Sequence, residues 1–345
     1  MKAHLRTIVL CGITILLLAL FLRQASIADV WNEIQAGDSG LVLLAVAVAM
    51  ATYALRAFRW QYLLRALGPT HFGAAFRTTV IGFAVNFLLP GRVGEVVRPY
   101  LLAREERLSA TSAFATVILE RLLDMVTVLV LFGVFLLVFD PRQSPVAPRL
   151  FRDIRTGGLA AGVSALVALT VVFALAGHPD AAARVALRIE RVLPARIAQA
   201  VSRLVHMFVT GLSAVRQPSR LAMTFVLSFP LWLSIATGIF LVTRAFHVDM
   251  PFTGTFVVMT ILVVGVAVPT PGAVGGFHLF YQVAVTAFYL VPKDRAMGAA
   301  IVLHAVSFLP VTLLGIIFMA SEGLSLGRVR GLAKLAGEQE QEGTR

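Results

Sequence analysis

The sequence contains few charged residues for its length. Charged side chains make up 14% of the 345 residues and hydrophobic ones 58%, whereas an ordinary soluble domain carries about 25% charged residues. This deficit excludes a soluble protein with an ordinary core, so the lipid bilayer must be the solvent for much of the chain. We expect an all-α polytopic membrane protein, because a helix satisfies its backbone polar groups internally.

Cysteine and lysine are also scarce. The single cysteine, Cys11, excludes a disulfide framework and any cysteine-rich metal site. Lysine occurs only at positions 2, 293 and 334, so arginine carries nearly all of the net charge of +12. Because the arginines stand in short blocks between apolar runs, they indicate membrane topology and contact with anionic lipids, and not nucleic-acid binding.

Several motifs of catalysis and energy supply are missing. The sequence has no H-E-x-x-H, no histidine and cysteine cluster, and no G-x-x-x-x-G-K-[ST] loop. We therefore expect no metal, no other cofactor and no ATP as the energy source.

Six apolar segments approach or exceed the roughly 20 residues that a membrane-spanning helix needs. Three further stretches are shorter and stop at or beside proline or glycine, which indicates two re-entrant or broken-helix hairpins. The alternative for the second, Phe256–Val291, is two thin spans. The first span begins with a basic segment that also suits a signal peptide, but no clean cleavage pattern follows it. The six segments are Thr7–Leu22, Leu41–Leu64, Ala113–Phe139, Gly157–Ala176, Leu221–Phe246 and Met297–Ala320, and the three short ones are Thr78–Leu89, Phe256–Val268 and Gly275–Val291.

The arginine blocks predict the topology. Arg56, Arg59 and the basic residues of 179–219 should face the cytoplasm, which places both termini there. Trp60 reads as an anchor at the membrane interface. Residues 1–330 form one transmembrane domain, in which 179–219 is an amphipathic linker lying on the membrane surface, and residues 331–345 form a disordered tail.

The chain contains an internal repeat. Residues 90–95 read PGRVGE and residues 271–276 read PGAVGG, and in each half a short apolar run precedes the motif. By the arginine count, the first half (41–139) and the second half (221–320) are inverted relative to each other. Inverted repeats with paired broken helices are typical of transporters, with the substrate near the breaks. The alternative is that the proline-glycine pairs mark ordinary loops.

The first break predicts an anion site. Gly91 and Gly94 allow the backbone to approach a ligand, and a helix starting after Pro90 would direct free N–H groups into the membrane. Arg92 and Arg98 would suit a phosphate. Alternatively, this stretch is a cytoplasmic loop with positive-inside arginines.

Three ionisable residues lie inside the apolar segment Ala113–Phe139. Glu120 and Asp124 share one helix face, and Arg121 can bridge to Asp124. They either take part in transport or form a salt-bridge cluster that holds an arginine in place. His278 and His304 lie in the second half as candidate proton relays, and packing is the alternative role for each.

Three motifs resemble those of a known family. Residues 86–98 read NFLLPGRVGEVVR, residues 120–124 read ERLLD, and residues 269–276 read PTPGAVGG. They resemble the hallmark motifs of the flippase-like family, which is the family of the lysylphosphatidylglycerol synthase transmembrane domain. The resemblance runs from about Leu41 to Ala320. It implies a polytopic protein of the bacterial inner membrane that moves lipids or lipid-linked molecules between leaflets.

The resemblance also has departures. Family members commonly carry a glutamate just after the second glycine-rich element, where this chain has Phe277 and His278. The chain also leaves no room for an aminoacyl-transferase domain, so we expect no lysylphosphatidylglycerol synthesis.

The leading hypothesis is a flippase or scramblase for a phosphate-bearing lipid, with anionic or polyprenyl-phosphate lipids as partners. The alternatives are a membrane-embedded lipid-modifying enzyme and a non-transporting subunit of a lipid-synthesis complex, and a homo-oligomer is left open. The candidate site residues are Asn86, Pro90, Gly91, Arg92, Gly94, Glu95, Arg98, Glu120, Arg121, Asp124, Pro271, Gly272, Gly275, Gly276 and His278.

Overall fold

The computed structural model describes residues 2–22, 26–89, 91–139, 148–177, 218–267, 270–329 and 331. These ranges form helices and short turns and contain no strand, which confirms the all-α prediction. The helices are α1 (Lys2–Leu22), α2 (Ile27–Ala36), α3 (Ser39–Leu64), α4 (Phe72–Leu88), α5 (Gly94–Glu106), α6 (Ala110–Val138), α7 (Pro148–Gly177), α10 (Pro218–Ala245), α11 (Gly254–Ala267), the 3-10 turn η2 (Pro271–Ala273), α12 (Gly276–Tyr289) and α13 (Lys293–Ser321).

Four of the described helices are long and apolar enough to cross a membrane: α3, α6, α10 and α13. They correspond to four of the six predicted spans. The other two predicted segments lie within α1 and α7. Counting α1 and α2 together as one bent span would add a fifth crossing. The chain is therefore an integral membrane protein with at least four apolar spans among its described residues.

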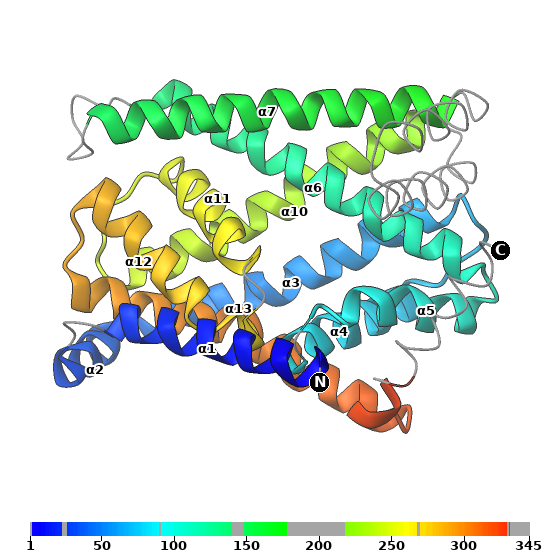
Figure 1. Cartoon of the computed structure of the whole chain (residues 1–345), viewed down its shortest axis with the longest axis horizontal. Helices are drawn as coiled ribbons and strands as arrows, with labels where there is room; N and C mark the ends of the chain where they lie inside the picture. Colours follow the sequence, from blue (N-terminus) through cyan, green and yellow to red (C-terminus); the bar gives the residue numbers. More distant parts are fainter. Residues whose placement is uncertain are drawn as a thin grey trace.

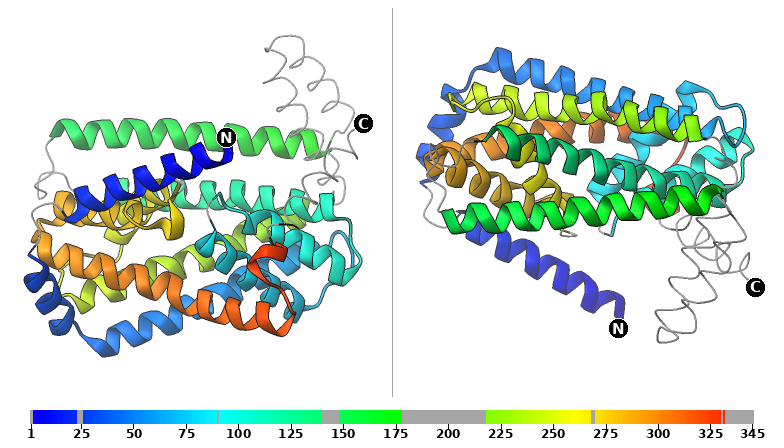
Figure 2. Two further views of the ribbon diagram at one scale, coloured as in Figure 1. Left: turned by 60° about the horizontal axis from the view of Figure 1, so that its bottom comes forward. Right: turned by 90° about the horizontal axis from the view of Figure 1, so that it is seen from above.

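The long helices lie lengthwise beside one another (Figure 1). The most extensive helix–helix contact joins α3 and α10, where Thr52 and Ser234 share a hydrogen bond of 2.8 Å between their hydroxyls. A polar contact of this kind stabilises helix association where the surrounding lipid is as apolar as the side chains. Helix α7 packs on the outside of α6 (Figure 2).

Two hairpins of short helices lie between the long ones. Helices α4 and α5 meet where Gly82 faces Gly94, and a Cβ on Gly94 would lie 1.9 Å from the Gly82 carbonyl oxygen. Helices α11 and α12 meet in the same way, because a Cβ on Gly276 would lie 2.7 Å from the carbonyl oxygen of Gly265. Glycine is therefore required at both crossings, where the backbones touch.

The order of helix lengths recurs along the chain. Helices α3 to α6 have 26, 17, 13 and 29 residues, and α10 to α13 have 28, 14, 14 and 29. Each half thus runs long, short, short, long, and the sequence motif that repeats falls between the two short helices. At these breaks, Gly91 (φ +89°) and Gly275 (φ +84°) adopt left-handed backbone conformations, which glycine tolerates without steric cost.

The two hairpins lie toward opposite ends of the molecule, and their breaks approach each other near its middle (Figures 1 and 2). A Cβ on Gly272 of η2 would lie 3.3 Å from the ring of Phe87 in α4. Arg92, after the first break, donates a hydrogen bond of 3.2 Å to the Val266 carbonyl oxygen of α11. The contacts join residues more than 170 positions apart, so the breaks are neighbours in space.

Some predictions fall on parts of the chain that the structure does not describe. Residues 178–217, which include nearly all of the predicted linker 179–219, lie outside the described residues, as do Pro90 and residues 332–345. The amphipathic linker and the disordered tail stay predictions.

Candidate functional site

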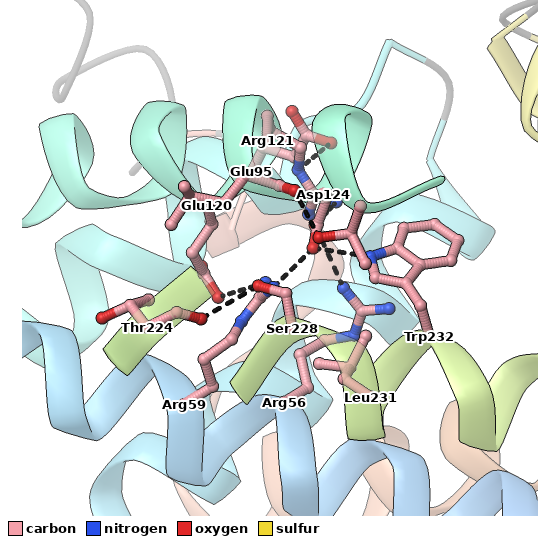
Figure 3. A network of polar contacts seen from close by, with 12 residues as sticks. Arg56, Arg59, Glu95, Glu120, Arg121, Asp124, Thr224, Ser228, Leu231 and Trp232 are labelled. Atoms are coloured by element: carbon pink, nitrogen blue, oxygen red, sulfur yellow. Dashed lines mark hydrogen bonds and ion pairs between the residues drawn. The ribbon is translucent and has the colours of Figure 1, made fainter. Parts of the chain in front are cut away.

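A cluster of charged side chains lies inside the helix bundle (Figure 3). Helix α6 supplies two carboxylates, Glu120 and Asp124, which are four residues apart and so project from one face. Helix α3 supplies Arg56 and Arg59 by a three-residue spacing, and α5 supplies Arg98. All five side chains are buried. We call these five residues the buried charge cluster.

Arg59 is the centre of the buried charge cluster. Its Nη1 lies 2.6 Å from Asp124 Oδ1 and 2.7 Å from the hydroxyl of Ser228 in α10, and its Nη2 lies 3.1 Å from Glu120 Oε1. One guanidinium therefore joins both carboxylates of α6 to two other helices. This planar group with several fixed donors is suited to such bridging, and lysine could not reproduce the geometry.

Arg98 occupies the other side of Glu120. Its Nη1 donates to Glu120 Oε2 at 3.0 Å, and its guanidinium carbon lies 3.7 Å from the ring centroid of Trp60. The Trp60 indole in turn donates a hydrogen bond of 2.9 Å to Thr116. The prediction that Trp60 is an anchor at the membrane interface is therefore wrong. The ring is fully buried within the bundle, where it packs against the guanidinium group of Arg98.

Asp124 is the most heavily contacted carboxylate. Besides Arg59, its Oδ1 accepts a 2.9 Å hydrogen bond from the indole nitrogen of Trp232. Its Oδ2 lies 3.4 Å from Arg121 Nη1 and 3.8 Å from Arg56 Nη1. The predicted bridge from Arg121 to Asp124 is confirmed, and the carboxylate contacts two other helices, α3 and α10, as well as its own.

Burying the charges of this cluster within a membrane protein costs free energy. Moving a charge out of water costs several kcal/mol, and only close partners with good geometry repay that cost. Here three arginines face two carboxylates, and buried donors of Arg98, namely Nε and Nη2, have no hydrogen-bond partner among the described residues. The cluster therefore has an excess of positive charge and donors that an anion could satisfy.

A second group of charged residues links this cluster to the first break. The Glu95 carboxylate lies 3.8 Å from Arg92 and 3.7 Å from Arg121. These distances are longer than those of a charge-assisted hydrogen bond, about 2.8 Å. The three side chains are also partly exposed, by 27% for Glu95, 35% for Arg121 and 47% for Arg92. We call Arg92, Glu95 and Arg121 the exposed triad.

The structure thus separates the two arginines that the sequence placed together. Arg92 lies before α5, in a left-handed conformation (φ +55°), and is exposed, whereas Arg98 is buried within α5 beside Trp60. Asn86 and Gly94 lie together at the crossing of α4 and α5, since a Cβ on Gly94 would meet the Asn86 amide oxygen at 2.8 Å. That oxygen is buried without a hydrogen-bond partner in the described structure.

The second break carries histidine and aromatic residues in place of charges. Pro271 and Gly272 form η2, and Gly275 and Gly276 lead into α12, where His278 is buried. The Gly272 carbonyl oxygen accepts a hydrogen bond of 2.8 Å from His304 of α13. The ring centroids of His278 and His304 lie 4.5 Å apart, so the structure brings together the two histidines that the sequence singled out separately.

Sequence reasoning missed four residues of the site. Arg56 and Arg59 look like positive-inside residues that end a span, but both are buried in the bundle and face the carboxylates. Ser228 and Trp232 lie in an apolar span and carry no distinguishing signal. The spacing of Arg56 and Arg59 on one helix face, opposite Glu120 and Asp124, is the signal that could have found the arginines.

The buried and the accessible charges of this site differ in their pairing. The described residues contain no group of three metal-ligating side chains that could hold an ion. Both buried carboxylates already contact arginines. What remains accessible is the exposed triad, where one carboxylate lies loosely between two guanidinium groups.

The long apolar helices and the charges buried between them define a class: polytopic helical membrane proteins. Within that class, the model of the lysylphosphatidylglycerol synthase transmembrane region matches residues 7–315. The chain belongs to this family, which confirms the resemblance that the three motifs carry.

Comparison with curated proteins finds archaeal relatives. A UPF0104 membrane protein of Methanothermobacter thermautotrophicus is 26% identical over 333 residues, which cover 89% of this chain and 93% of the relative. A second UPF0104 membrane protein of that organism is 22% identical over 319 residues. Glycosyltransferase AglD of Haloferax volcanii is 26% identical over 341 residues, covering 91% of this chain and 54% of that protein. The chain thus spans about half the length of AglD.

Proposed function

We propose that this protein moves a phosphate-bearing lipid, or a lipid-linked intermediate, between the two leaflets of the plasma membrane. One observation carries the proposal: Glu95 lies between Arg92 and Arg121 at distances of 3.8 and 3.7 Å, beside the point where two helix breaks meet. The carboxylate occupies a place that a phosphate, with more acceptor oxygens, would fill with closer contacts.

The charge balance supports an anionic cargo. Together, the buried charge cluster and the exposed triad contain five arginines and three carboxylates, an excess of two positive charges. In a low-dielectric setting such an excess attracts an anion strongly. When the phosphate binds Arg92 and Arg121, Glu95 is displaced, and when the phosphate leaves, Glu95 returns and keeps the arginines paired.

The repeated helix order supports a transport mechanism. In the proposal, α3–α6 and α10–α13 are inverted repeats whose hairpins enter the membrane from opposite sides, with both termini in the cytoplasm. The hairpins approach from opposite ends of the molecule in Figure 1. Transporters built in this way bind substrate where the breaks meet and expose it alternately to each side. The exposed triad lies at that meeting point.

Similarity to a protein named as a glycosyltransferase favours a second candidate cargo, a lipid that carries sugar through a phosphate. The same arginines would bind that phosphate, so both candidates share the chemistry. The alternative role as a subunit of a lipid-synthesis complex, and that of an enzyme in its own right, predict no lipid movement by the isolated protein.

The test is lipid movement in proteoliposomes. Purified protein is reconstituted with fluorescent phosphatidylglycerol, and dithionite quenching from outside reports how much probe has left the inner leaflet. We expect wild-type protein to expose the inner-leaflet probe. Arg92→Gln and Arg121→Gln should slow this about 10- to 100-fold, since a hydrogen bond to a charged group contributes about 1.5–3 kcal/mol.

Arg244→Gln is the matched control, because Arg244 is a partly exposed arginine paired with Asp249 and lies away from both breaks. A polyprenyl-phosphate probe is run beside phosphatidylglycerol. If wild-type protein leaves both probes protected, the transport proposal is wrong. If only the polyprenyl probe moves, the cargo is the lipid-linked intermediate.

A further inference from the structure

The second break contains a pair of histidines that the proposed anion site does not use. His278 of α12 and His304 of α13 are buried, and their ring centroids lie 4.5 Å apart. The rings are bordered by phenylalanines from four elements: Phe21 of α1, Phe87 of α4, Phe277 of α12 and Phe308 of α13.

The hydrogen bond to Gly272 fixes the proton on one ring. A carbonyl oxygen can only accept, so His304 Nε2, at 2.8 Å from the Gly272 oxygen, must carry a hydrogen. His278 Nδ1 is buried and has no hydrogen-bond partner among the described residues. The pair thus combines a fixed donor with an unused nitrogen that can take up a proton.

No other charged group competes for that proton. Among the described residues, neither imidazole forms an ion pair within 4.0 Å, and the titratable group that faces each ring is the other ring. Helices α11 and α12 contain no aspartate, glutamate, lysine or arginine. On the other elements that pack against α12 or α13, the charged residues are Lys2 and Arg6 of α1, Asp29 and Glu33 of α2, Arg56 and Arg59 of α3, Arg77 of α4, Glu120, Arg121 and Asp124 of α6, and Arg220 and Arg244 of α10, and α13 itself carries Lys293, Asp294 and Arg295.

Among these phenyl rings, the pair of His278 and His304 can bind one proton but not two. The faces of phenyl rings attract a cation, whereas two adjacent imidazolium rings repel each other. A single proton shared by the pair would also sit beside the break, because His304 holds Gly272, and Gly272 lies against Phe87. Phe87 lies five residues before Arg92, which donates a hydrogen bond to the Val266 carbonyl oxygen.

We propose that the His278–His304 pair is a proton-binding site that couples inward or outward lipid movement to a proton gradient. The inference rests on the proposed function and adds its energy source. A proton from water forms an N–H bond with His278 Nδ1, and the same bond breaks when the proton returns to water on the other side. No other covalent bond changes, and the bound proton offsets the negative charge of the cargo phosphate.

Coupling makes a quantitative prediction for the distribution of lipid. If one proton accompanies each lipid phosphate, a pH difference of one unit can drive a tenfold difference in probe concentration between leaflets. An uncoupled scramblase would leave the probe equally distributed, whatever the gradient. The equilibrium distribution therefore separates coupling from movement, which a rate alone does not.

The first experiment measures that distribution in phosphatidylcholine vesicles with a trace of fluorescent phosphatidylglycerol and a one-unit pH gradient. Wild-type protein should produce about a tenfold asymmetry that disappears when an ionophore collapses the gradient. His278→Gln should abolish the asymmetry, while His71→Gln, which changes an exposed histidine paired with Glu106, should keep it. Equal distribution with wild-type protein under the gradient would overturn the inference and leave the proposed function standing.

The second experiment does not require transport. Nitrogen-15 labelling of histidine allows NMR to follow both rings, assigned through His278→Gln and His304→Gln, from about pH 3 to about pH 8, a range wide enough for buried imidazoles. We expect one proton to bind to the pair, with the His304 Nε2–H retained throughout. If neither ring titrates, the proton site does not exist, even in a protein that moves lipid. If wild-type protein moves no probe, the transport proposal fails, and this titration alone decides the proton site.

Discussion

The two breaks share a backbone design and differ in their chemistry. Both join short helices that cross at touching glycines, Gly82 with Gly94 and Gly265 with Gly276. The first break leads through Arg92 and Glu95 to the charges of α6, whereas the second holds histidines among phenyl rings. The common backbone fixes where the breaks meet, and the side chains that each half adds determine what can bind there.

The largest expected effect is on the charges behind the first break. Asp124→Ala would leave Arg59 and Arg56 buried without that carboxylate, and removal of one partner of a buried ion pair costs about 3–5 kcal/mol. Thermal unfolding in detergent should show a large loss of stability. The exposed pair of Arg244 and Asp249 is the control, since Asp249→Ala should leave the unfolding temperature nearly unchanged. Equal losses in both variants would mean that the buried cluster is not a structural element.

The next effect compares the glycine crossings directly. Gly94→Ala places a Cβ 1.9 Å from the Gly82 oxygen, and Gly276→Ala places one 2.7 Å from that of Gly265. Overpacking usually costs about 1–3 kcal/mol, so we expect Gly94→Ala to lower the unfolding temperature more than Gly276→Ala. Gly133→Ala in α6, where no atom lies within 4 Å, should have little effect. The reverse order would show that the first crossing yields more easily than its geometry indicates.

The smallest effect on stability is expected at the exposed triad. Arg121→Gln removes partly exposed contacts of 3.4 and 3.7 Å, which contribute about 1 kcal/mol or less to folding. The same variant should strongly slow lipid movement under the proposed function. Measuring both quantities on one preparation tests whether function and stability separate at this residue. A stability loss as large as that of Asp124→Ala would place Arg121 in the structural cluster.

The sequence allowed prediction of the helical class, four of the long apolar spans and the short helices that end at the proline-glycine breaks, because apolar length and proline-glycine pairs depend on local chemistry. It also identified Glu120 and Asp124, since ionisable residues in an apolar span are conspicuous. It could not pair them with Arg59, because that contact joins residues 61 and 65 positions apart. The role assumed for Trp60 was wrong for a related reason: burial depends on which helix lies opposite.

The histidines also show that sequence does not predict contacts between distant residues. The sequence identifies His278 and His304 as separate candidates. Their separation of 26 residues gives no indication that the rings touch, because the contact arises only when α12 packs against α13. The inversion of the two halves was inferred from the positions of arginines, and two of these, Arg56 and Arg59, lie within the bundle. The recurrence of helix lengths is therefore the stronger argument for a repeat.

Arg59 bonds to side chains on α6 and α10 at the same time, and Arg98 joins α5 to α6. Sliding α6 by a single helical turn would break the contacts of Arg59 and Arg98 with Glu120 and Asp124, and it would leave buried charges in surroundings that cannot solvate them. Helices α3, α5, α6 and α10 must therefore move together as one rigid block. Under the proposed function, the motion that moves lipid is therefore confined to the turns at the breaks and to helices outside this rigid block, such as α11 and α12, and a small molecule bound between the block and these helices should stop lipid movement without contacting the charges.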